Sequence, residues 1–337
     1  MRLLVTGGLG FIGSNFIRYW FKKHGNDTII NLDKVTYAAD PHNLDGVEDR
    51  YDYVFVKGDI TNKETVFKVA KGTDAIINFA AETHVDKSIK NAETFVKSNV
   101  LGVYILLEAA RRYNIRFHQV STDEVYGALP LNSRTKFTEN SKYAPRNPYS
   151  ATKAAADHLV NAYFNTYRLP VTISNCSNNY GPYQHPEKLV PKTIINALLN
   201  NPIPVYGNGV QVRDWIYVTD HCSALETILF KGEHGQTYLI SANQERHNLE
   251  IVNVILRFIG RDNKLIKFVE DRPGHDARYA IDAKKISKEL SWKPKTKLEE
   301  GLKLTINHYT ENLDRYLKKR VHEQKNRRYN TGRRYGL

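Results

Sequence analysis

Three glycines near the N-terminus constrain the fold more than any other feature of the chain. Gly7, Gly10 and Gly13 follow a short apolar run, Arg2–Thr6, and apolar residues from Ile12 onward recur at helical spacing. A glycine-rich turn between a strand and a helix lets the backbone approach a pyrophosphate closely and presents free N–H groups to it. The segment therefore predicts the first βα unit of a dinucleotide-binding sheet.

The first 175 residues continue this alternation of strands and helices. Five further runs are short and rich in β-branched or aromatic residues: Thr28–Leu32, Tyr53–Lys57, Ala75–Phe79, Arg116–Ser121 and Val171–Asn175. Runs of this kind are typical of buried parallel strands. Helices are expected over Ala92–Tyr113 and from about Tyr149 to Arg168. The pattern predicts an α/β fold with a doubly wound parallel (Rossmann) sheet over residues 1–176.

The second half of the chain has a different pattern, with turn-rich stretches after Ser177. Five short helices are predicted, at Lys188–Asn200, His221–Phe230, Leu249–Ile259, Ala283–Leu290 and Leu298–Tyr316. Two strands are predicted, at Gln236–Ile240 and Leu265–Val269. We therefore expect a second, smaller α/β substrate domain at 177–316, with a cleft between the two domains. The chain is expected to cross back to the sheet around 207–245.

Composition limits the environment and the partners. The formal net charge is +13, of which the last 20 residues carry +7, from eight Lys or Arg and one Glu. We interpret residues 317–337 as a basic, solvated tail; contact of this tail with nucleic acid is the alternative. No apolar run approaches the roughly 18 residues of a membrane span. The two cysteines are too few for a disulfide framework, and a cytoplasmic location is expected.

A carboxylate at the end of the second strand indicates which dinucleotide is bound. Asp33 lies 20 residues beyond Gly13, where a carboxylate accepts hydrogen bonds from ribose hydroxyls and repels a 2′-phosphate. NAD is therefore favoured over NADP, although Lys34 follows directly. The alternative interpretation of Asp33 is a helix cap or loop charge. Asp59-Ile60 and Ala80-Ala81, past the third and fourth strands, are further candidates for cofactor contact.

The chemistry is predicted from two clusters of polar residues. Thr122, Asp123 and Glu124 begin at the end of a strand, and Tyr149 and Lys153 lie one helical turn apart. A nearby ammonium favours the phenolate form of a tyrosine, which can take a proton from a sugar hydroxyl while NAD takes the hydride. Two adjacent carboxylates are not needed for that step, so they indicate an additional acid–base step.

Motifs along most of the chain carry a family resemblance. They are Gly7–Ser14, Ala80–Ser88, Ser121–Gly127, Tyr149–Lys153, Asn175–Tyr183, Pro186–Leu189, Arg213–Val218, Asn248-Leu249 and Asp271–Asp276. With them the chain resembles the extended short-chain dehydrogenase/reductase family, and within it the sugar-nucleotide 4,6-dehydratases. Three positions depart from that pattern: Thr83 replaces a usual Ser, Ala39-Asp40 replaces Gly-Asn, and the basic tail has no counterpart.

The resemblance implies an NAD-dependent lyase acting on dTDP-glucose or a similar nucleotide sugar. Tyr149, with Thr122 close to the reacting oxygen, would deprotonate the C4 hydroxyl as NAD accepts the hydride. Glu124 would then remove the C5 proton, and Asp123 would protonate the C6 hydroxyl as water leaves. The hydride would return to C6. The base of the nucleotide is implied only by the resemblance, so UDP or CDP stays open.

The resemblance also implies which residues bind. The cofactor set is Gly7, Gly10, Phe11, Ile12, Gly13, Asp33, Lys34, Thr36, Asp59, Ile60, Ala80, Ala81, Thr83, Asn99, Tyr149, Lys153 and Asn179. The substrate set is Thr83, His84, Thr122, Asn178, Lys188, Leu189, Pro204, Tyr206, Arg213, Asn248, Asp271, Arg272 and His275. The alternative for Arg213 is an ion pair with Asp214.

Other expectations complete the interpretation. Cys176 and Cys222 are expected to be packing residues, and the histidines show no spacing typical of a metal site. The helices at Ala92–Tyr113 and Tyr149–Arg168 have apolar stripes on more than one side, which, with the resemblance, implies a homodimer. Two other functions stay open from the sequence: a related nucleotide-sugar 4-epimerase or decarboxylase, and a nucleotide-binding regulator whose tail binds nucleic acid.

Overall fold

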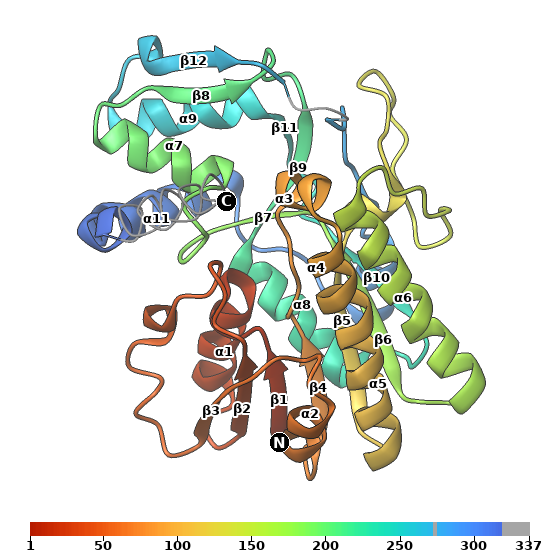
Figure 1. Cartoon of the computed structure of the whole chain (residues 1–337). Coiled ribbons are helices and arrows are strands. Elements are labelled where there is room, and N and C mark those ends of the chain that lie inside the picture. Colours follow the sequence, from red (N-terminus) through yellow and green to blue (C-terminus); the bar gives the residue numbers. More distant parts are fainter. Residues whose placement is uncertain (272–274, 319–337) are drawn as a thin grey trace, which may run out of the picture.

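The main element of the protein is a seven-stranded parallel sheet, seen in the computed structural model of residues 1–271 and 275–318 (Figure 1). Its strand order is β10-β6-β5-β4-β1-β2-β3. The strands are β1 (Arg2–Thr6), β2 (Thr28–Asp33), β3 (Tyr53–Lys57), β4 (Ala75–Asn78), β5 (Arg116–Thr122), β6 (Val171–Cys176) and β10 (Thr237–Ile240). The winding direction reverses between β1 and β4, so a crevice opens at their carboxyl ends. The predicted doubly wound fold is confirmed.

Helices cover both faces of this sheet. One face packs against α1 (Phe11–Lys23) and α8 (Val218–Lys231), where Phe16 and Trp20 are fully buried together with Leu225. The other face packs against α2 (Lys63–Ala70), α5 (Gly102–Tyr113) and α6 (Pro148–Tyr167). Truncating one such core aromatic residue to Ala would cost about 3–5 kcal/mol. This packing fixes the strand ends that carry the site.

The predicted helix at Ala92–Tyr113 is not regular. It consists of α4 (Glu93–Phe95), a π-helical stretch η2 (Val96–Leu101) and α5. The wide turn carries Asn99, which is buried and accepts from Glu82 N (2.8 Å), while its amide donates to Glu82 O (3.0 Å) and Thr152 Oγ1 (2.9 Å). Stretches of π-helix occur often at functional sites. Here the stretch anchors the segment that follows β4, which borders the crevice.

The second half of the chain forms a smaller layer above the sheet (Figure 1). It has two small sheets: β7 (Asn178–Tyr180), β9 (Val212–Tyr217) and β11 (Glu245–His247), and β8 (Ile203–Tyr206) with β12 (Ile266–Val269). Its helices are α7 (Leu189–Leu198), α9 (Asn248–Ile259) and α11 (Leu298–Glu311). They enclose a core around Tyr180 and Trp215. The strands β7, β8, β9 and β11 were not predicted.

The chain returns to the large sheet after β9. There α8 covers one face and β10 pairs in parallel with β6, from Thr237 opposite Ile173 to Ile240 opposite Cys176. The helix α10 (Lys284–Leu290) then packs on β10. The remaining short elements are α3 (Val85–Lys90), η1 (Pro41–Leu44), η3 (Asp123–Tyr126) and η4 (Asn263–Leu265). Within the described ranges, no helix is long and apolar enough to cross a membrane. The basic tail beyond residue 318 lies outside them.

Candidate functional site

The turn between β1 and α1 is shaped to receive a phosphate group. Gly7 has φ of +71°, and a Cβ at this position would lie 2.7 Å from Ala80 N. A Cβ on Gly13 would lie 2.4 Å from Gly7 O. Neither position accepts a larger residue, so the backbone runs close to β4 and leaves the N-terminus of α1 open to the crevice. These glycines form the cradle that a dinucleotide pyrophosphate requires.

Asp33 closes the adenosine end of the crevice. Its carboxylate accepts from Leu9 N (3.0 Å) and Val35 N (2.8 Å), and burial raises its pKa despite these bonds. Each carboxylate oxygen keeps a further lone pair for a ribose hydroxyl. Lys34 Nζ lies 2.6 Å from Asp59 Oδ2, so a carboxylate already offsets its charge. The arrangement therefore fits the unphosphorylated ribose of NAD.

Thr122, Asp123 and Glu124 form a turn at the end of β5. We call it the catalytic turn, because all three are predicted catalytic residues. The 3-10 helix η3 starts at Asp123, and Glu124 N donates to Thr122 Oγ1 (3.3 Å). The chain then leaves through Gly127, whose φ is +85° and where a Cβ would lie 2.5 Å from Ala144 O. Because the strand has already ended, Asp123 and Glu124 are not directed to opposite faces of the sheet. Both line the same cleft.

Asp123 and Glu124 have different environments. The Asp123 side chain is 2% exposed, and its Oδ2 has no hydrogen-bond partner among the described residues. Burial, followed by the negative charges of Glu124 and Asp214, raises the pKa of Asp123 well above its usual range, and Arg213 only partly opposes this. The raised pKa favours the protonated form of Asp123, whereas the Glu124 side chain is only half-buried. Two adjacent carboxyl groups in such different environments are suited to act as an acid and a base.

Tyr149 and Lys153 face this turn from the first two turns of α6. The helix starts with a capping box between Asn147 and Ser150, which fixes where Tyr149 lies. The Thr122 side chain is near enough to the Tyr149 phenol to oppose the rise in its pKa, while Lys153 Nζ donates to Val120 O (2.8 Å). We expected Lys153 to lower the pKa of Tyr149. In the structure burial raises the pKa of Tyr149, and the negative charge of Glu124 raises it further.

The cleft has a volume of about 330 Å³ and brings most of the predicted residues together. Those that line it are Gly7, Gly10, Phe11, Ile12, Gly13, Asp33, Lys34, Thr36, Asp59, Ile60, Ala80, Ala81, Thr83, Thr122, Asp123, Glu124, Tyr149, Lys153, Asn178, Asn179 and Lys188. Asn99 is not in the lining, because its amide is used to hold Glu82. His84 lies beside the cleft, with Nε2 3.2 Å from Glu187 Oε2.

The remaining predicted substrate residues form a second group in the smaller layer. His275 Nδ1 lies 2.6 Å from Asp271 Oδ1, and the Tyr206 ring meets the His275 ring edge-on at 6.4 Å. Arg213 packs over the Tyr279 ring at 4.3 Å and donates to Asp276 O (3.0 Å). Pro204 lies on β8, and Leu189 and Asn248 begin α7 and α9. Arg272 lies outside the described residues. The charge of Arg213 reaches Asp123, which links this group to the catalytic turn.

Several residues in the cleft were not predicted. They include Glu82, Ser98, Ser121, Cys176, His185 and Glu187. Cys176 had been interpreted as a packing residue, but its sulfur lies in the lining and accepts from Asn179 Nδ2 (3.3 Å). Burial raises the pKa of its thiol to about 12, so it is not a nucleophile. Its position at the carboxyl end of β6, where ligands bind in such sheets, was the available signal.

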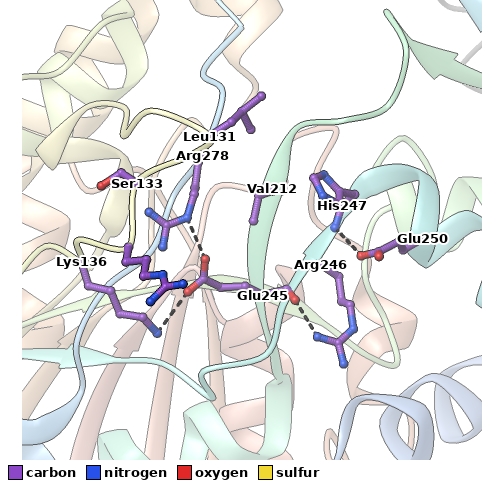
Figure 2. Close-up of a pocket in the computed structure, with 10 residues that line it drawn as sticks. Leu131, Ser133, Lys136, Val212, Glu245, Arg246, His247, Glu250 and Arg278 are labelled. Atoms are coloured by element: carbon purple, nitrogen blue, oxygen red, sulfur yellow. Dashed lines mark hydrogen bonds and ion pairs between the residues drawn. The ribbon is translucent and has the colours of Figure 1, made fainter.

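A second hollow is lined by residues of β9, β11 and the loop after η3 (Figure 2). Its volume is about 520 Å³, and none of the predicted site residues lines it. Glu245 lies at its centre, 2.8 Å from Arg278 Nε and 3.1 Å from Lys136 Nζ. These ion pairs join β11 to the loop after η3, through Lys136, and to the segment before α10, through Arg278, so we interpret the hollow as a structural junction. The chemistry of its lining residues identifies the first cleft as the candidate active site.

Comparison with known proteins gives the family. A family model described as GDP-mannose 4,6 dehydratase matches residues 4–305. A dTDP-glucose 4,6-dehydratase from Mycobacterium tuberculosis is 50% identical over 313 residues, covering 93% of this chain and 94% of the relative. The chain belongs to the dTDP-glucose 4,6-dehydratase family.

Solved structures of this family and of its neighbours share the fold. A dTDP-glucose 4,6-dehydratase from Streptomyces venezuelae, crystallised with NAD bound, has a TM-score of 0.89 at 42% identity, covering 93% of this chain and 98% of that one. A UDP-glucose 4-epimerase from Thermotoga maritima has a TM-score of 0.86 at 26% identity, covering 93% and 100%. Dehydratases and epimerases therefore share this architecture.

Proposed function

We propose that this protein is an NAD-dependent dTDP-glucose 4,6-dehydratase that forms dTDP-4-keto-6-deoxyglucose. One observation carries the proposal beyond the fold: Asp123 and Glu124 line the same cleft as Tyr149, and burial raises the pKa of Asp123 well above its usual range. An acid and a base beside a tyrosine relay are what an elimination of water requires. The names of the relatives at 45–50% identity support the same activity.

The cofactor cradle supports NAD. The Gly7–Gly13 turn would hold the pyrophosphate, and Asp33 would hold the adenosine ribose. When bound, NAD supplies a hydride acceptor for C4 and later the hydride donor for C6. Asn179 is fixed at the other end of the cleft, because its amide donates to Ser177 O (3.0 Å) and its Oδ1 contacts His221 Nδ1 (2.9 Å).

The residues of the turn and of α6 divide the proton transfers. Tyr149 removes the proton of the C4 hydroxyl, and Thr122, whose side chain is near the phenol, helps to place that oxygen. Glu124 removes the C5 proton, which the adjacent 4-ketone makes acidic. Asp123 gives its proton to the C6 hydroxyl, so that water leaves. The assignment of the acid to Asp123 follows from its burial next to two other carboxyl groups.

The nucleotide is assigned to the second group of residues. The guanidinium of Arg213 suits a diphosphate, because its planar fork matches phosphate geometry. Lys188, at the N-terminal end of α7, adds a second cation at the edge of the cleft. Tyr206, on the exposed end of β8, offers a ring for base stacking. We therefore place the sugar at the 122–124 turn, and the base near β8 and β12.

The test uses dTDP-glucose labelled with deuterium at C4. The expected product carries that deuterium at C6 and a solvent hydrogen at C5, measured by NMR and mass spectrometry. An epimerised sugar with deuterium retained at C4 would reject the proposal in favour of an epimerase. Parallel turnover with UDP-glucose and CDP-glucose tests the base, and dTDP-glucose is expected to give the highest kcat/KM.

We also propose a homodimer and the division of the chain into domains 1–176 and 177–316, with a return to the sheet around 207–245. The helical face formed by Val96, Leu101 and Tyr104 supports the dimer, because these three large side chains are each more than 40% exposed. They lie along η2 and α5, on a part of the helix not covered by the sheet. Such an exposed apolar face marks an interaction surface.

A further inference from the structure

A buried carboxylate that no sequence argument singled out lies behind the catalytic residues. Asp157 is on α6, one turn after Lys153, and its side chain is completely buried. A single oxygen, Oδ2, accepts from Ser121 Oγ (2.7 Å), Asn175 Nδ2 (3.1 Å) and Tyr143 OH (3.2 Å). Its other oxygen, Oδ1, has no hydrogen-bond partner among the described residues. An ionised carboxylate with two oxygens suits such a cluster of donors, because it only accepts.

The hydrogen bonds of Asp157 reach the catalytic turn from two strands. Ser121 immediately precedes Thr122 on β5. Asn175 lies opposite Ser121 on β6, and its amide also donates to Thr122 O (3.1 Å). Asp157 therefore ties the ends of β5 and β6 to the helix that carries Tyr149 and Lys153. A shift of this carboxylate would move both halves of the proton relay relative to each other.

Asp157 and Lys153 are an acid and a base buried in the same region. They are four residues apart on a helix, where side chains are neighbours. Burial lowers the pKa of Lys153 and raises that of Asp157, and the charge of each residue opposes the change in the other. Each residue therefore stays charged more readily while the other residue is charged.

The other titratable groups that face this region are neutral near pH 7. Burial raises the pKa of Tyr143 from the loop before α6, of Tyr126 from η3, and of Cys176 from β6. Burial also raises the pKa of Asp123, which follows the end of β5, and so favours its neutral form. Among these neighbours, Asp157 is the counter-charge for the Lys153 ammonium.

We propose that Asp157 is the buried counter-charge that keeps Lys153 an ammonium, and the positioning residue that fixes the Thr122–Glu124 turn against α6. Asp157 touches none of the reacting atoms; it acts through Lys153 and the two strand ends. The Lys153 ammonium lies one helical turn from Tyr149 and donates to Val120 O (2.8 Å) on β5. The catalytic form of the site thus depends on a charge outside the cleft lining.

The first test is the pH profile of Asp157→Asn, which keeps the shape and removes the charge. Without the counter-charge, Lys153 loses its proton at lower pH, so the alkaline limb of kcat/KM for dTDP-glucose is expected to move down by at least about one unit. Activity would fall about tenfold at pH 9 and less than about threefold at pH 6.5. Tyr143→Phe is the matched control: it removes one hydrogen bond from the same oxygen, changes no charge, and should leave the limb in place. A wild-type profile in Asp157→Asn would overturn the proposal.

The pH test rests on the proposed dehydratase activity, so a second test does not use turnover. Apparent melting temperatures are measured for Lys153→Met, Asp157→Asn and the double variant. If the pair is ionic, Lys153→Met leaves an unpaired buried carboxylate, and adding Asp157→Asn raises the melting temperature again. Additive losses would overturn the proposal. If the wild type is inactive but the melting temperatures of the double-mutant cycle are non-additive, the proposed function is rejected and the ion pair is still supported.

Discussion

Replacing Asp123 by Asn tests the assignment of the general acid most directly. Asn has nearly the same size as Asp, so the variant keeps the buried shape at the end of β5 and loses only the proton that can be transferred. A general acid contributes about 10²–10⁴ in rate, or about 2.7–5.4 kcal/mol of activation free energy. We expect a rate loss within this range, because the Asp123 side chain is 2% exposed and water has little access to act as the proton donor in its place.

The loss of rate in Asp123→Asn should be confined to the elimination of water. Oxidation at C4 depends on Tyr149, so rapid mixing with dTDP-glucose should still show reduction of bound NAD at 340 nm, within about threefold of the wild-type rate. Loss of water from C6 should be slowed by about 10²–10⁴. Glu124→Gln is the matched comparison, because it removes the base and keeps the acid. In D₂O, mass spectrometry should find deuterium at C5 with Asp123→Asn and none with Glu124→Gln.

Two results would refute this reasoning. Turnover of Asp123→Asn within about threefold of the wild type would show that the buried carboxyl group does not protonate the leaving hydroxyl. Equal exchange at C5 in both variants would show that Glu124 is not the base. In either case the two roles would have to be reassigned, although the fold and the cofactor cradle would be unaffected.

Three further predictions concern stability and assembly. Because folding raises the pKa of Asp123, this group contributes favourably to folding stability below about pH 4, and the contribution is lost as the pH rises through its pKa in the folded protein. Asp123→Asn should therefore have a higher melting temperature than the wild type at about pH 7, and the difference should vanish toward about pH 3. Gly7→Ala places a Cβ against Ala80 at φ +71°, so it should cost about 1–3 kcal/mol and release NAD on gel filtration. Leu101→Arg should convert a dimer into monomers in light scattering, whereas Leu131→Arg, also exposed but on a loop away from that face, should not.

The sequence predicted the large sheet better than the smaller layer. Continuous apolar runs such as Leu3–Val5 show buried parallel strands directly. The strand β9 has no such run, because Arg213 and Asp214 lie in its middle and are buried through contacts with Tyr279 and Ser241. Buried polar residues of this kind depend on partners distant in sequence, and a local pattern does not show them.

The site was predicted where chemistry and spacing coincide. Tyr149 and Lys153 are spaced for one helix face, and Asp123 and Glu124 are adjacent, so both pairs could be identified from the sequence. Asp157 could not, because an acid four residues after a lysine on a helix is indistinguishable from an exposed ion pair. Only the three-dimensional packing of α6 on β5 and β6 shows that this pair is buried.

The acid and the base of the elimination lie on the 3-10 turn after β5, apart from the elements that bind NAD and oxidise the sugar. The cradle at Gly7, the ribose site at Asp33 and the relay at Tyr149 arise from other strands and helices. A new acid or base at this turn can therefore alter the fate of an oxidised sugar without rebuilding the machinery that oxidises it. The same scaffold can host different reactions because the step-specific groups occupy one short, replaceable segment.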